Sequence, residues 1–127
     1  MGAFKDTDQV EYCATFRKVK FKSNVYFTGA KFSGGVISFL GAEFFGKNIY
    51  FLKTEFSGGS AYFTDAKFNK GNVNFIGAKF IKGKVYFNGA EFAGGNVIFI
   101  GTEFTGAEAN FRKTIFSYNL TFEQNKM

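Results

Sequence analysis

Phenylalanine recurs along the chain in alternating steps of five and seven residues, and a smaller residue stands two places before each ring. From residue 27 the rings occupy positions 27, 32, 39, 44, 51, 56, 63, 68, 75, 80, 87, 92, 99, 104, 111 and 116. In an extended segment, residues two apart point to the same face. Triplets such as Val25-Tyr26-Phe27 and Ala30-Lys31-Phe32 therefore predict short strands that bury the two outer residues and expose the middle one.

Glycine-rich segments follow the second ring of each repeat, as in Ser33-Gly34-Gly35, and supply the backbone freedom that corners need. An α-helix is excluded because steps of five and seven do not keep one face at 3.6 residues per turn. Short strands joined by corners in a 12-residue repeat predict an all-β parallel β-helix, a solenoid. The segments 16–27 and 116–122 break the period slightly, as terminal coils often do.

Charged residues that precede the second ring of each repeat indicate the length of one coil. Residues 24 apart are always opposite in charge, whereas half of the pairs 12 apart are alike. Coils that stack about 4.8 Å apart favour opposite charges over one another. The order of these charges along the chain predicts a 24-residue coil with four sides, about four coils, and surface ion pairs between neighbouring coils. The series is Lys31, Glu43, Glu55, Lys67, Lys79, Glu91 and Glu103.

Asparagine recurs with the period of this predicted coil, at positions 24, 48, 72 and 96, and we expect these side chains to form structural ladders at a corner. A substrate-binding array is the less favoured alternative. Residues 1–13 are predicted to cap the first coil, with a short helix over residues 6–13. Residues 14–122 are predicted to form the β-helix and residues 123–127 a short tail. Cys13 is expected to be a buried capping residue.

Five-residue units such as Ala30-Lys31-Phe32-Ser33-Gly34 and Ala90-Glu91-Phe92-Ala93-Gly94 resemble the pentapeptide-repeat family, over about residues 14–122. The resemblance implies a right-handed quadrilateral parallel β-helix whose central residue, and the one two before it, point inward. This chain departs from the family by adding two residues to each pair of units. Some members imitate DNA and bind type II topoisomerases through an acidic surface, whereas this chain carries a net charge of +6. The resemblance therefore implies the fold and leaves the function open.

Catalytic and metal-binding chemistry has little support in the composition. The 127 residues include no His and one Cys, so neither a Ser-His-Asp arrangement nor a zinc site is expected. We predict a non-enzymatic protein without cofactors. No long apolar segment or signal peptide is found, which favours a cytoplasmic location.

Outward positions on one side of the predicted solenoid are more apolar than those on the opposite side. This apolar strip comprises Tyr26, Tyr50, Leu52, Ile76, Ile98 and Ile100. An exposed strip of this kind predicts a homodimer or another protein partner. The alternative is that β-propensity alone selects these residues. Association through the carboxyl-terminal coil is a second route to a dimer.

Basic residues gather just before the regular repeats, in a patch formed by Arg17, Lys18, Lys20 and Lys22. The favoured interpretation is a solvated end that keeps the first coil from pairing with another molecule. The alternative is an anionic partner such as a type II topoisomerase, nucleic acid or an acidic protein. The leading prediction is a structural or protein-interaction module.

Overall fold

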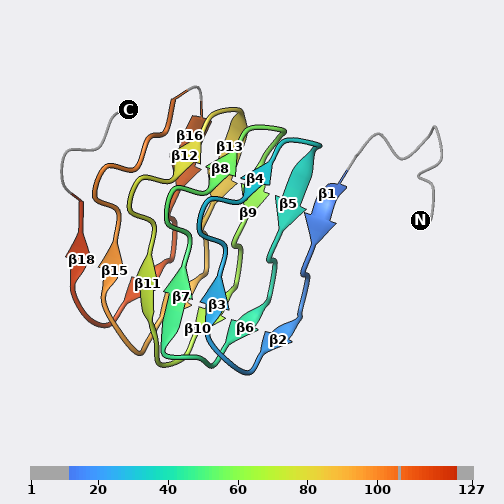
Figure 1. The fold of residues 1–127 in the computed structure, drawn as a ribbon. Coiled ribbons are helices and arrows are strands. Elements are labelled where there is room, and N and C mark those ends of the chain that lie inside the picture. The colour runs from blue at the N-terminus through green and yellow to red at the C-terminus, as the bar shows by residue number, and fades with distance from the viewer. Residues whose placement is uncertain (1–11, 106, 123–127) are drawn as a thin grey trace.

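The computed structural model describes residues 12–105 and 107–122, which wind as a right-handed parallel β-solenoid of about four coils (Figure 1). Every strand pairs in parallel with the strands of neighbouring coils, and the described residues contain no helix. Ile49 pairs with Val73, and Val73 pairs with Val97, so successive coils are about 24 residues apart. The predicted fold class and coil length are confirmed.

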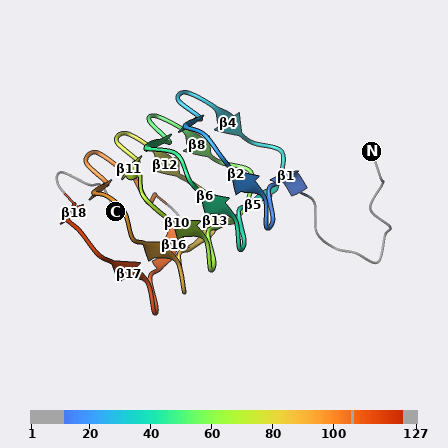
Figure 2. The same ribbon diagram turned by 90° about the horizontal axis from the view of Figure 1, so that it is seen from below.

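Four short sheets, which we call sheets A to D, form the four sides of the solenoid (Figures 1 and 2). Sheet A contains β1 (Tyr12–Thr15), β5 (Val36–Ser38), β9 (Ala61–Tyr62), β13 (Gly83–Tyr86) and β16 (Ala107–Asn110). Sheet B contains β2 (Lys20–Phe21), β6 (Glu43–Phe44), β10 (Lys67–Phe68), β14 (Glu91–Phe92) and β17 (Ile115–Phe116). Sheet C contains β3 (Val25–Tyr26), β7 (Asn48–Tyr50), β11 (Asn72–Asn74), β15 (Val97–Ile98) and β18 (Leu120–Thr121). Sheet D contains β4 (Lys31–Phe32), β8 (Glu55–Phe56) and β12 (Lys79–Phe80), and Glu103 bridges to Lys79.

The interior consists of stacked phenylalanine rings with smaller side chains beside them. In the sheet B column, Phe44 and Phe68 stack with centroids 4.5 Å apart and planes at 5°. Rings of the sheet A and sheet C columns meet edge to face, as Phe63 and Phe75 do at 89°. Offset-stacked and edge-to-face arrangements are the two that aromatic rings prefer. One ring and one smaller residue therefore point inward from each side, as the triplets predicted.

In each repeat a tight turn follows the first ring, and the second residue after that ring has a positive φ. In the turn of residues 27–30, the N–H of Ala30 donates to the carbonyl of Phe27 at 3.0 Å, and Gly29 has a φ of 74°. A positive φ at the third position of such a turn is typical of type II. Glycine adopts it without strain, but lysine or aspartate occupies several equivalent positions, which are Lys18, Lys53, Asp65 and Lys113.

Polar side chains join successive coils at the corners and in the core. Asn24 Oδ1 accepts hydrogen bonds from the N–H groups of Lys47 and Asn48, at 2.9 and 3.0 Å, and Asn72 Oδ1 accepts one from Asn96 N–H at 2.9 Å. The asparagines therefore have a structural role, and these contacts run from side chain to backbone. The predicted ladder instead joined the side-chain amide of one asparagine to that of the next.

The two terminal coils have a shorter corner between sheets B and C. Lys20 pairs with Glu43, and Val97 pairs with Leu120, so these partners lie one position closer along the chain than the partners in the regular coils. These are the two places where the sequence period is broken. Strand β1 begins at Tyr12, so the paired strands start two residues before the predicted boundary at residue 14. Residues 12 and 13 of the predicted cap, which spans residues 1–13, belong to this strand and not to the helix expected over residues 6–13. Residues 1–11 of the cap, the Cys13 side chain and the tail 123–127 lie outside the described part of the structure.

Candidate interaction surface

All six residues of the apolar strip lie on sheet C and on the turns that follow it. Tyr26, Tyr50 and Ile98 share one column, because Tyr26 pairs with Tyr50 and Asn74 pairs with both Tyr50 and Ile98. A second column holds Leu52, Ile76 and Ile100, whose carbonyls accept hydrogen bonds from Gly29, Lys53 and Gly77 of the preceding coils at 2.9, 2.9 and 3.0 Å. The structure therefore brings the strip together as two adjacent columns.

The strip is partly open to solvent along its length. Tyr26 is 58% exposed, and its ring meets the Tyr50 ring edge to face with centroids 5.3 Å apart. The other five side chains are half-buried. Asn74 interrupts the first column, and its Oδ1 accepts a hydrogen bond from the N–H of Ile76 at 2.9 Å. That contact pairs the amide oxygen of Asn74 within the chain.

The opposite side, sheet A, is more polar and holds an aromatic pair that the sequence analysis did not single out. The rings of Tyr62 and Tyr86 stack with centroids 4.7 Å apart and planes at 5°. Next to them, a shallow depression of about 310 Å³ is lined by Lys84, Glu108 and Arg112 among others. The recurrence of Tyr at outward positions 62 and 86, one coil apart, is the signal that could have revealed the stack.

The alternating charges stack as predicted, in one ladder on sheet B and another on sheet D. Register pairs join Lys67 to Glu43 and Glu91, and Lys79 to Glu55 and Glu103. The prediction of ion pairs between these residues is wrong, because their charged groups do not come within 4.0 Å of one another. Within residues 12–105 and 107–122, the one Lys/Arg to Asp/Glu contact within 4.0 Å joins Lys84 Nζ to Glu108 Oε1, at 3.9 Å and on sheet A. Neighbouring coils place the charged residues side by side, yet the ends of these long, solvated side chains do not reach ion-pair distance.

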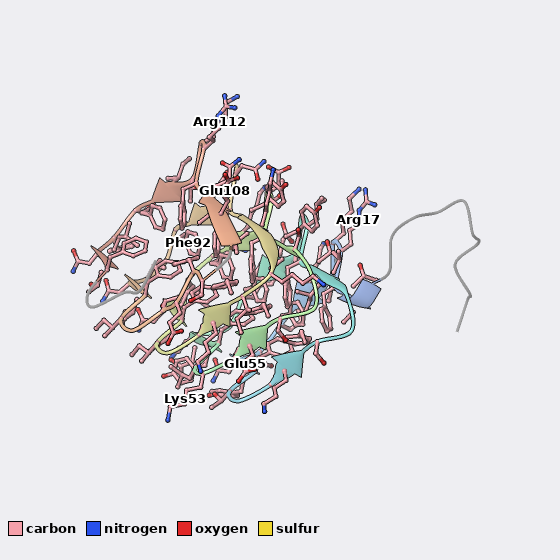
Figure 3. All side chains as sticks on the ribbon, turned by 90° about the horizontal axis from the view of Figure 1, so that it is seen from above. Arg17, Lys53, Glu55, Phe92, Glu108 and Arg112 are labelled. Carbon is pink, nitrogen blue, oxygen red and sulfur yellow. The ribbon has the colours of Figure 1, made fainter. Side chains whose placement is uncertain are left out.

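The basic patch lies on the first coil, on strand β2 of sheet B and on the segments directly before and after that strand. Arg17, Lys18, Lys20 and Lys22 are all exposed. Lys22 Nζ lies 5.9 Å from the centre of the Phe45 ring, a weak cation–π contact at an exposed site. Figure 3 shows Arg17 and Arg112 projecting from the same side at opposite ends of the solenoid, and Lys53 projecting from the other side.

The carboxyl-terminal coil exposes several large apolar side chains. Tyr118 is 61% exposed, and Ile115, Leu120 and Phe122 are also exposed. The Phe122 ring stacks on Phe99 at 4.7 Å, so one face of this outer ring is covered from within the chain. Within the described residues, no group of three His, Cys, Asp or Glu side chains is placed to hold a metal ion.

Four short parallel sheets around a phenylalanine core define a quadrilateral β-solenoid. Residues 16–67 match the family model of pentapeptide repeats (9 copies), and the same coil geometry continues through β18. Residues 16–67 are thus pentapeptide repeats, and the match supports a pentapeptide-repeat protein. This match suggests a structural or protein-interaction module, on a fold that is typically non-catalytic. No curated protein and no solved structure matches the chain. The part of the chain that the structure describes contains no helix long and apolar enough to span a membrane.

Proposed function

We propose that the protein is a non-enzymatic protein-interaction module that self-associates through the apolar strip. The observation that carries this proposal is the gathering of six apolar, partly exposed side chains into two columns on one side of a rigid solenoid. Contiguous apolar surface of this kind marks association sites on soluble proteins. Sheet A offers a more polar surface, since its outward strand column ends in Asn110 and the turn column beside it ends in Arg112.

The test is sedimentation equilibrium of the wild-type chain and of Ile76→Lys. Ile76 is half-buried at the centre of the strip, so a lysine there leaves the core intact and places a charge in the contact. We expect a wild-type dimer and a dissociation constant raised about tenfold or more in the variant. Leu40→Lys is the matched control, because Leu40 is a half-buried residue in the equivalent turn after sheet A. A monomeric wild-type protein, or equal effects of the two variants, would contradict the proposal.

A second candidate function is binding of an anionic partner through the basic patch. It is supported by four exposed cations on one coil and by the net charge of +6. Binding to phosphates weakens steeply with salt because counterions are released, whereas apolar contacts persist. Pull-down from lysate at low and high salt therefore separates the two candidates. A partner lost at high salt, and lost also from an Arg17→Ser/Lys20→Ser variant at low salt, would favour the basic patch.

A further inference from the structure

Sheet D carries an unbroken ladder of alternating charge in four successive coils. Its outward positions are Lys31, Glu55, Lys79 and Glu103, fixed by direct register pairs. Among the described residues, none of these four makes an ion pair within 4.0 Å. Their charges therefore stay available to a partner that lies against this side.

The ladder complements itself in one orientation and repels itself in the other. In a two-fold symmetric dimer the same surface patch of each copy meets its equivalent. With antiparallel solenoid axes, Lys31 faces Glu103 of the second copy and Glu55 faces Lys79 of the second copy. With parallel axes, each rung faces its own counterpart, so lysine meets lysine and glutamate meets glutamate. Juxtaposed like charges suppress an arrangement, so the ladder selects the antiparallel dimer.

An apolar column runs along one edge of this ladder. It belongs to the apolar strip and holds Leu52, Ile76 and Ile100, on the turns between sheets C and D. The antiparallel two-fold operation sets Leu52 against Ile76 of the second copy. At the other edge of sheet D, Ile81 is also exposed. Apolar burial then supplies most of the attraction, and the ladder sets orientation and register.

Sheet B has the same alternation in its first four coils but is a poorer surface for a second copy. Lys20 belongs to the basic patch, whose other members flank this ladder with positive charge. The fifth coil continues the column with Ile115, which has no charged counterpart. An excess of positive charge repels an identical surface. The sequence therefore offers one balanced ladder beside an apolar column, and that ladder lies on sheet D.

We propose that a second copy of the chain docks against sheet D with antiparallel axes, and that the two-fold axis passes between the Glu55 and Lys79 rungs. This inference rests on the proposed self-association. It moves the centre of the contact from sheet C to sheet D, keeps the strip column of Leu52, Ile76 and Ile100 at the edge of the contact, and adds the orientation and the register.

Zero-length carbodiimide cross-linking of the wild-type protein tests the orientation. Within one chain Lys31 and Glu103 are three coils apart, about 14 Å along the solenoid, and other ladder side chains lie between them. We expect a Lys31–Glu103 link in the dimer band, and a link between isotopically labelled and unlabelled chains when the two are mixed. A dimer that lacks this link overturns the orientation and leaves self-association standing. A protein that stays monomeric at every concentration overturns both proposals.

Charge exchange provides a second test. Glu55→Lys places lysine against Lys79 of the second copy twice in each dimer, and Lys79→Glu likewise opposes two glutamates. We expect each variant alone to dimerise about tenfold more weakly at low salt. Mixing the two variants restores opposite charges at every rung, so we expect a heterodimer of wild-type affinity. Glu43→Lys and Lys67→Glu change the sheet B ladder in the same coils and are the matched controls. If the control variants weaken dimerisation equally, the ladders act between the coils of one chain and not between two copies, and the proposal is overturned.

Discussion

At the residue scale, the inward position two residues before the second ring of each repeat holds either alanine or threonine. No buried side-chain polar atom of the described residues lacks a hydrogen bond. Thr102 is fully buried, and its Oγ1 donates to the carbonyl of Phe75 at 2.8 Å. The same carbonyl accepts the N–H of Ala78 at 3.0 Å. Thr54 and Thr114 make equivalent contacts with Phe27 and Phe87, at 2.8 and 2.6 Å. Each hydroxyl thus adds a bond between coils where an alanine would have none.

Thr102→Val is expected to lower the free energy of unfolding by about 1 kcal/mol, the usual net contribution of one hydrogen bond. Valine fills the same volume, and the Phe75 carbonyl keeps its bond to the N–H of Ala78. Urea denaturation monitored by far-ultraviolet circular dichroism measures the change. Thr105→Val, at an exposed position, is the control and should stay within about 0.5 kcal/mol of the wild type. A loss at Thr102 no larger than the control's would mean that the buried bond contributes nothing.

At the scale of the strand and its turns, glycine has two separate roles. Gly29 has a φ of 74°, and a side chain there would meet nothing within 4 Å. Gly94 has no positive φ, yet a β-carbon on it would overlap the Cα of Lys70 in the preceding coil. The first glycine therefore serves backbone conformation, and the second serves the close approach of two coils at a corner.

Alanine substitution separates these roles. Gly29→Ala is expected to cost about 1–2 kcal/mol, the penalty of a left-handed conformation for a residue with a β-carbon. Gly94→Ala should cost more than about 3 kcal/mol or prevent folding, because backbone has to move to relieve the overlap. Thermal and urea unfolding of the two variants supply the comparison. Equal costs would show that the coils adjust at this corner and that the close approach is unimportant.

At the scale of the whole molecule, the sequence predicted the solenoid because two independent periods agree. The ring spacing gives the inward positions, and the charge order gives a 24-residue coil, which the pairing of Glu55 with Lys79 confirms. The turns with a positive φ after the first ring were not predicted, since lysine at position 53 conceals a site that glycine usually marks. The regular spacing of these residues, two places after every first ring, is the signal that could have revealed the turns.

The candidate surface was predictable in its location and not in its contacts. Alternation along a strand fixes which side chains point outward, so the columns of Tyr26 and Leu52 follow from the repeat. Contacts between flexible charged side chains do not follow from register, as the missing ion pair between Glu43 and Lys67 shows. Nor does an outward column reveal its partner, because the same residues suit both a dimer and a solvated strand.

Stacked coils that contact only their neighbours should open from their ends. The N–H of Phe63 donates to Tyr86 at 2.6 Å, and that of Phe75 donates to Ile98 at 2.8 Å, with a further coil on each side. The N–H of Phe16, which donates to Ser38 at 2.7 Å, belongs to the first coil described and has such support on one side. In a one-dimensional array of this kind, terminal units exchange through local opening.

We expect the Phe63 and Phe75 amides to exchange hydrogen for deuterium at least about tenfold more slowly than the Phe16 amide. Nuclear magnetic resonance at fixed protein concentration measures these rates. Uniform protection along the chain would mean that the stacked rings couple all the coils into one cooperative unit.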